Sequence, residues 1–284
     1  MLKQQLLSAE PKPFVKWAGG KRQLMPIIEK NMPPDFGTYF EPFLGGGAVL
    51  FHLLSKNPSM RCVVSDLNSE LVLAYCTIRD RVKELVLSLE NHSRHYLKNP
   101  DSYYYSVRDS SPANHVDKVS RLLFLNRTCF NGLYRVNSKG KFNVPLGRYS
   151  NPNIVNEENL LAVSHILQSK KIQITCQDFS SVLSGAKKND FVYFDPPYQP
   201  TSRTANFTSY TDRNFSYEDL EMLVDVSEKL DKKGCKVLHS NSKSDEVIGL
   251  FSPKWKITEI PVNRAINSDS AKRTGHTELL IKNY

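Results

Sequence analysis

The chain has 284 residues, of which 40% are hydrophobic and 24% charged, and this composition excludes a disordered protein. Its five cysteines are scattered singly, and it has neither a signal peptide nor a run of 18 apolar residues, so we expect a cytoplasmic protein without disulfide framework, metal site or membrane partner. The net charge of +9 favours nucleic acid as a partner, although many basic enzymes bind none.

Short apolar runs alternate with longer amphipathic stretches along most of the chain. Strands are predicted at residues 39–43, 61–66, 172–176, 191–195 and 236–239, and helices at about 48–54, from about 68, and at 217–230. This alternation indicates an α/β fold with a parallel sheet. The last two predicted strands, 257–262 and 278–281, have no helix between them and should form an antiparallel hairpin at the edge.

Residues 69–155 interrupt this alternation. Helical stretches are followed by a segment, 126–149, that is rich in arginine, asparagine, glycine and aromatic residues. This composition suits an inserted, mostly helical module better than strands of the sheet. We therefore predict two parts of one α/β domain, 1–68 and 156–284, separated by an inserted domain at 69–155.

A glycine-rich loop, Gly45-Gly46-Gly47, follows the first predicted strand. It lacks the phosphate-loop pattern, and Leu50 stands where a dinucleotide fingerprint has its last glycine. Asp66 ends the next strand, where a carboxylate can accept hydrogen bonds from ribose hydroxyls. We predict a nucleoside cofactor without pyrophosphate, such as S-adenosyl-L-methionine. The alternative is a simple turn followed by a surface aspartate.

The tetrapeptide Asp195-Pro196-Pro197-Tyr198 follows the strand predicted at 191–195. The prolines lack N–H groups, so a carboxylate and a free carbonyl stand next to an aromatic ring. Two acceptors suit an exocyclic amino group on a planar base, and the ring can stack on a base that has left its duplex. Alone, the tetrapeptide could be an ordinary turn.

Together these motifs resemble the class alpha DNA adenine-N6 methyltransferases that modify GATC. The matching segments are 16–21, 40–47, 66–68, 131–135, 142–145, 147–149 and 195–198. The resemblance spans nearly the whole chain and implies a Rossmann-like methyltransferase sheet with an inserted target-recognition domain. It also implies S-adenosyl-L-methionine as cofactor and double-stranded DNA as partner.

The resemblance assigns cofactor binding to several residues. They are Trp17, Lys21, Phe43, Gly45, Gly47, Asp66, Asp178, Phe179 and Asp195. Asp178 and Phe179 resemble an acidic-aromatic pair beside the cofactor adenine. The alternative for Asp178 is the N-cap of a helix.

Cationic and aromatic residues interleave in the inserted segment. They are Arg127, Phe130, Tyr134, Arg135, Lys139, Arg148 and Tyr149. Arginine can pair with guanine, and exposed rings can wedge between bases. The alternative is a solvated basic loop with aromatic residues in the core.

The resemblance also assigns DNA contacts. Arg135, Leu133 and Lys16 are expected to read bases, and Phe130 and Asn131 to fill the gap left by an extruded adenine. Tyr149 and Arg148 are expected to bind flanking DNA. The family more often has tyrosine where Phe130 stands, but a ring without its hydroxyl can still wedge.

We therefore predict adenine-N6 methylation of duplex DNA within GATC, with Asp195, Pro196, Pro197 and Tyr198 as the catalytic residues. Two alternatives stay open: an RNA adenine methyltransferase, and a non-catalytic DNA-binding regulator on the same fold. The sequence also leaves open whether the chain acts alone or with a cognate restriction endonuclease as a functional, not physical, partner.

Overall fold

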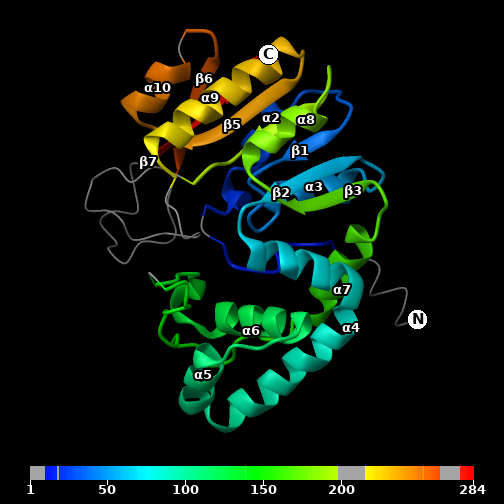
Figure 1. Cartoon of the computed structure of the whole chain (residues 1–284), viewed down its shortest axis with the longest axis vertical. Helices are drawn as coiled ribbons and strands as arrows, with labels where there is room; N and C mark the ends of the chain where they lie inside the picture. Colours follow the sequence, from blue (N-terminus) through cyan, green and yellow to red (C-terminus); the bar gives the residue numbers. More distant parts are fainter. Residues whose placement is uncertain (1–9, 18, 138, 198–214, 252, 263–275) are drawn as a thin grey trace.

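A seven-stranded sheet forms the centre of the computed structural model, which describes residues 10–17, 19–137, 139–197, 215–251, 253–262 and 276–284 (Figure 1). In chain order the strands are β1 (Tyr39–Glu41), β2 (Cys62–Asp66), β3 (Ile172–Cys176), β4 (Phe191–Phe194), β5 (Lys236–Ser242), β6 (Lys256–Val262) and β7 (His276–Lys282). Their order across the sheet is β3-β2-β1-β4-β5-β7-β6. The first five strands are parallel, and β7 is antiparallel to both β5 and β6. The predicted α/β sheet with an antiparallel edge hairpin is confirmed.

The strand order reverses between β1 and β4. From β1 the chain adds β2 and β3 on one side, and then returns to add β4 and β5 on the other. In open α/β sheets, ligands bind at the carboxyl ends of the strands next to such a reversal. The glycine loop after β1, Asp66 at the end of β2 and Asp195 after β4 all lie at this edge.

Each face of the sheet carries its own hydrophobic core, because successive side chains of a strand point to opposite faces. Tyr39, Cys62 and Phe191 contribute to one core, whereas Phe40 and Val192 contribute to the other. With both faces covered, the central strands are almost entirely buried. This burial holds their carboxyl ends in fixed positions.

Helices cover both faces of the sheet, and two of them match the helices predicted at about 48–54 and at 217–230. They include α2 (Met25–Asn31), α3 (Ala48–Lys56), α7 (Glu157–Leu167), α8 (Val182–Gly185), α9 (Tyr217–Lys232) and α10 (Asp245–Phe251). Ser216 caps α9 by accepting a hydrogen bond from the Asp219 N–H, and the Asp219 carboxylate accepts one from the Ser216 N–H. This capping box fixes the start of α9.

Strand β5 is longer than the sequence predicts. The prediction ends at residue 239 because Ser240, Asn241 and Ser242 are polar, yet all three are buried in the strand. The Ser240 hydroxyl hydrogen-bonds with the Tyr193 hydroxyl at 2.7 Å, which satisfies both groups inside the sheet.

A long helix, α4 (Ser69–Lys98), connects the sheet to the helical module. It bends at Arg81, whose backbone angles are not helical. Beyond the bend it packs against α5 (Pro100–Asp109) and α6 (His115–Thr128), so a group of helices lies beyond one side of the sheet (Figure 1). Asn68, Asn99 and Asn114 each cap one of these three helices with a side-chain oxygen. The predicted helical character of the insert is confirmed, and its boundaries at 69 and 155 remain a prediction.

After α6 the chain forms a short 3-10 turn, η2 (Phe130–Gly132), and then a hairpin. Isolated antiparallel bridges join Cys129 to Leu146 and Val136 to Phe142. We call residues 129–147 the recognition hairpin.

The five cysteines are free thiols. None of the helices in the described ranges is long and apolar enough to cross a membrane.

Candidate active site

Asp195 and Lys21 form an ion pair at the carboxyl end of β4. Lys21 Nζ lies 2.8 Å from Asp195 Oδ1 and also donates to the carbonyl of Gly19 at 2.8 Å. The Lys21 side chain is 3% exposed and that of Asp195 19%. Two residues that the sequence predicted for the site, far apart in the chain, are thus joined. The pair fixes the N-terminal segment against the edge of the sheet.

Burial raises the pKa of Asp195 to about 6, because it disfavours the charged carboxylate. The positive charge of Lys21 lowers this pKa, and the negative charge of Glu278 in β7 raises it. At neutral pH Asp195 is therefore a carboxylate that can accept hydrogen bonds, and it takes up a proton in mildly acidic solution.

Pro196 is buried and Pro197 is exposed, directly after Asp195. Neither proline has an N–H group, so their carbonyls are the only backbone hydrogen-bonding groups they present. Tyr198, predicted to stack on the target base, lies outside the described residues.

Asp66 holds the glycine loop in place from the end of β2. Its Oδ2 accepts from the Gly45 N–H at 2.8 Å, and its Oδ1 from the Asn68 N–H at 2.9 Å. Burial raises the pKa of Asp66, and these backbone hydrogen bonds oppose the rise. Each carboxylate oxygen can accept a second hydrogen bond, so Asp66 can hold the loop and also bind hydroxyl groups of a ligand.

The backbone conformation of the loop requires its glycines. The sequence alone could not distinguish this requirement from contact with a ligand. Gly45 and Gly47 have φ values of +50° and +71°, a region that other residues rarely adopt. A Cβ at Gly47 would lie 2.5 Å from the Tyr75 hydroxyl, and one at Gly45 would lie 3.2 Å from the Trp17 ring. The loop is thus closely packed against protein side chains.

Trp17 lies between the glycine loop and the recognition hairpin. Its ring centroid is 5.1 Å from that of Tyr134, whose hydroxyl donates to Glu70 Oε2 at 2.7 Å. The cofactor role predicted for Trp17 remains a prediction, whereas its packing connects the loop to the hairpin.

Phe43 and Phe179 stack with ring centroids 5.3 Å apart, and Phe215 packs against both. Phe43 is half-buried and Phe179 is buried. The Asp178 side chain accepts from the Ser180 N–H at 2.9 Å and caps the short helix η3 (Phe179–Ser181). The N-cap alternative for Asp178 is therefore confirmed, and its contact with a cofactor adenine stays a prediction.

Two acidic residues near Asp195 were missed by the sequence analysis. Glu41 ends β1, is 3% exposed and accepts from the Tyr39 hydroxyl at 3.0 Å, and burial raises its pKa. Glu278 in β7 lies opposite Ser242 of β5, and its Oε2 is buried with no hydrogen-bond partner. A charged residue directly before the apolar run 279–281 was the sequence signal for Glu278.

The charges at this edge fit the predicted cofactor. Asp66, Glu41 and Asp195 lie on the same face at the ends of three neighbouring strands, with Lys21 paired to one of them. S-adenosylmethionine brings a positive sulfonium and a positive ammonium group, which such carboxylates stabilise. Leu67, 55% exposed, follows Asp66 and offers an apolar contact beside it. The residues present therefore suit this group.

The N-terminal segment also contacts the recognition hairpin. Asn126 accepts from the Lys16 N–H at 2.8 Å and donates to the carbonyls of Lys16 and Gly132. The Lys16 Nζ lies 3.3 Å from the Tyr149 hydroxyl and 4.7 Å from the centre of that ring. Lys16 and Tyr149, both predicted DNA contacts, are thus adjacent. Asn126 was not predicted.

The other predicted DNA contacts lie on or next to the hairpin with different exposure. Phe130 is 44% exposed, Asn131 is exposed with φ +56°, and Arg148 is exposed. Leu133 and Arg135 are half-buried. Their contacts with DNA remain predictions.

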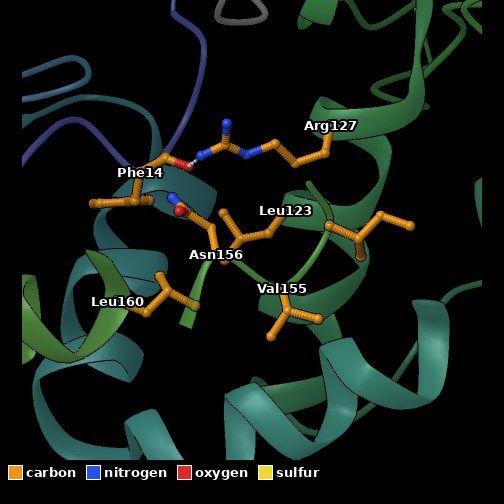
Figure 2. Close-up of a pocket in the computed structure, with 7 residues that line it drawn as sticks. Phe14, Leu123, Arg127, Val155, Asn156 and Leu160 are labelled. Carbon is orange, nitrogen blue, oxygen red and sulfur yellow. Dashed lines mark hydrogen bonds between the residues drawn. The ribbon is translucent and has the colours of Figure 1, made fainter. Parts of the chain in front are cut away.

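Two members of the cationic-aromatic set are structural. Arg127 donates to the carbonyl of Phe14 at 2.9 Å, and burial lowers its pKa (Figure 2). Figure 2 shows its guanidinium spanning from α6 to the N-terminal segment, above Asn156 and Leu160. Tyr134 is buried with its hydroxyl bonded to Glu70. Tyr134 is therefore a core aromatic residue, as the alternative interpretation has it, and the half-buried Arg127 connects α6 to the N-terminal segment.

The sheet order and the acidic residues at the strand ends are typical of an α/β protein that binds a ligand at the β1–β4 reversal. Residues 17–266 match the D12 class N6 adenine-specific DNA methyltransferases, and the chain belongs to this family. It is therefore an adenine-specific DNA methyltransferase, as the sequence predicted. The methyl donor of this reaction is S-adenosylmethionine, so the predicted cofactor is confirmed.

Relatives are similar along nearly their whole length. The Type II methyltransferase M.MjaIII of Methanocaldococcus jannaschii is 43% identical and covers 97% of this chain and 100% of its own. The Type II methyltransferase M1.LlaDCHI of Lactococcus lactis subsp. cremoris is 43% identical and covers 96% of this chain and 95% of its own. The DNA adenine methylase of Escherichia coli K12 is 31% identical, with 94% and 93% covered.

The raised pKa of Asp195 predicts the acid limb of the pH profile. Below pH 6 the carboxyl is protonated and loses its acceptor role, so kcat/KM should fall with an apparent pKa of about 6. Lys21→Met should move this limb to higher pH, because Lys21 lowers the pKa, and Glu278→Gln should move it to lower pH. The measurement is kcat/KM from pH 5 to 9 for the three proteins. A limb that neither variant moves would contradict this assignment.

Proposed function

We propose that the chain methylates N6 of adenine within GATC in double-stranded DNA. The observation that carries this proposal is the position of Asp195, which lies at the end of β4 in an ion pair with the segment that also reaches the recognition hairpin. One short segment, residues 14–21, thus connects a reaction site to a DNA-reading surface.

The amino group of adenine is a weak nucleophile, because its lone pair is delocalised into the ring. Asp195 and the carbonyl of Pro196 accept hydrogen bonds from its two N–H groups, which favours a pyramidal nitrogen with a localised lone pair. When bound, S-adenosylmethionine supplies an electrophilic methyl group. Asp195 then takes up the proton that the methylated nitrogen must lose, which suits a pKa of about 6. The protein forms no covalent intermediate, so its contribution is positioning and charge.

The target adenine must leave the duplex to reach Asp195. Tyr198 stacks on the extruded base, and Phe130 with Asn131 fills the gap. Phe130 is 44% exposed, so its ring is accessible for such a wedge between bases.

The residues that would hold the cofactor lie at the carboxyl ends of β1, β2 and β4 and on the segments next to them. Asp66 binds the ribose hydroxyls, and the remaining contacts fall on Trp17, Lys21, Phe43, Gly45, Gly47, Asp178 and Phe179. The half-buried carboxylate of Asp66, already fixed by two backbone N–H groups, supports this assignment.

The DNA sequence is recognised by Arg135, Leu133 and Lys16. Flanking DNA is bound by Arg148 and Tyr149. We also propose that the protein acts in the cytoplasm, with a cognate restriction endonuclease as a functional and not a physical partner.

The test of the substrate is transfer of a tritiated methyl group to matched DNA duplexes and RNA. We expect incorporation into duplex DNA that contains GATC and background counts in RNA. Faster transfer to RNA would contradict the proposal.

Asp195→Ala should lower kcat by roughly 10²–10³-fold, the scale for loss of one preorganised hydrogen-bonding group. It also removes the carboxylate that compensates the buried charge of Lys21, so the free energy of unfolding should fall by about 3 kcal/mol. Single-turnover methylation and urea denaturation measure the two effects.

Asp190→Ala is the matched control at the opposite end of β4. Asp190 accepts from the backbone N–H groups of Thr38 and Lys187 at 2.7 and 2.8 Å. This variant should lose stability while keeping the rate of methyl transfer. Turnover of Asp195→Ala within tenfold of wild type would refute the role of Asp195.

Asp66→Ala should weaken S-adenosylmethionine binding by roughly 1.5–3 kcal/mol, the scale for hydrogen bonds to a charged group. Calorimetric titration measures this, with the exposed Asp80→Ala on α4 as a control that should bind normally. An unchanged affinity of Asp66→Ala would place the ribose elsewhere.

Arg135→Ala should cost ~1–3 kcal/mol of discrimination at one guanine position of GATC and leave the other positions unchanged. The measurement is kcat/KM for GATC and its single-base variants. A uniform loss on all duplexes, with a salt slope lower by about one, would instead make Arg135 a phosphate contact.

A further inference from the structure

Arg135 and Asn143 face each other across the recognition hairpin. The Asn143 N–H donates to the Arg135 carbonyl at 3.1 Å. One residue closer to the turn of the hairpin, Val136 and Phe142 form an antiparallel bridge. Val144 anchors this strand, because it is 1% exposed and its carbonyl accepts from the Tyr104 hydroxyl at 2.9 Å. The backbone of Asn143 is therefore held firmly by the helical module.

Asn143 also holds the guanidinium of Arg135. The Arg135 Nε donates to Asn143 Oδ1 at 2.7 Å, and Nη2 donates to the Asn143 carbonyl at 3.2 Å. An arginine side chain loses ~2 kcal/mol of rotamer entropy when it is fixed. Here much of that loss is already incurred before DNA binds, which is the advantage of a preorganised group.

The contact leaves one edge of the guanidinium available. A guanidinium has five N–H bonds in a plane, and Asn143 uses the Nε–H and one Nη2–H on the same side. The other Nη2–H and the Nη1 hydrogens lie at the end of the side chain. Two parallel N–H bonds at this end can meet O6 and N7 of one guanine.

The chemistry of Asn143 suits this task better than a carboxylate would. An amide and a backbone carbonyl accept hydrogen bonds without neutralising the arginine. They also add no negative charge beside the phosphates of DNA. The guanidinium is thus oriented and keeps its full charge.

We propose that Asn143 is a positioning residue that orients Arg135, so that its terminal edge reads a guanine of the target site end-on. This inference rests on the proposed function, in which Arg135 reads that guanine. Asn143 acts through Arg135 and is therefore a determinant of specificity rather than of the methyl transfer itself.

The test compares kcat/KM on the GATC duplex and on duplexes altered at the guanine that Arg135→Ala identifies. Asn143→Ala should reduce discrimination at that position by about tenfold, within the range for one bidentate pair. Discrimination at the other positions and S-adenosylmethionine affinity should stay at wild-type values. In an Arg135→Ala background, Asn143→Ala should cause no further loss of discrimination.

Two further variants distinguish the orientation of Arg135 from a general destabilisation of the recognition hairpin. Asn143→Asp keeps the acceptor at Oδ1, so it should retain discrimination while weakening binding to every duplex through its added negative charge. Asn137→Ala is the matched control, because the Asn137 side chain accepts from the N–H groups of Lys139 and Lys141 in the hairpin turn. It should keep the wild-type ratio between duplexes.

The failures can be told apart. If Arg135→Ala flattens discrimination and Asn143→Ala leaves it within twofold of wild type, the role of Asn143 is overturned and the proposed function stands. A uniform loss in Asn143→Ala on all duplexes also overturns it. If Arg135→Ala itself leaves discrimination unchanged, the base-reading role of Arg135 fails, and the role of Asn143 fails with it.

Discussion

The buried ion pair between Lys21 and Asp195 is the interaction on which the rest of the site depends. Both charges are largely removed from water, so each needs the other, and removal of either leaves an uncompensated charge. The pair fixes the N-terminal segment at the edge of the sheet. A few residues earlier, Lys16 is held by Asn126 and Trp17 packs on Tyr134. The geometry of the reaction site and of the recognition hairpin is therefore set by one segment.

The edge of the sheet concentrates acidic side chains next to this pair. Parallel strands bring Glu41, Asp66 and Asp195 to one edge, and the antiparallel β7 adds Glu278. Burial raises the pKa values of the first three. Such a site is more stable with a positive ligand than without one.

Much of this architecture could be predicted from the sequence, because period-two and helical patterns report burial directly. The sheet, its edge hairpin and the residues Asp66 and Asp195 follow from such patterns. The end of β5 could not be predicted, because its residues are polar. The buried Ser240 hydroxyl is satisfied by Tyr193, a residue of another strand. Arg127 carried a DNA-binding signal, yet it bonds to the carbonyl of Phe14, a partner far away in the chain. Asn143 meets Arg135 and Glu278 lies opposite Ser242 through cross-strand register, which composition does not show.

In the proposed function, this edge of the sheet directs a methyl group to N6 of the adenine in GATC. Single-molecule sequencing of DNA methylated by the purified protein tests it most directly, because it reports the modified base, its position and the surrounding motif together. We expect N6-methyladenine at GATC on both strands and none elsewhere. Methylated cytosine, or methyladenine centred on another motif, would contradict it.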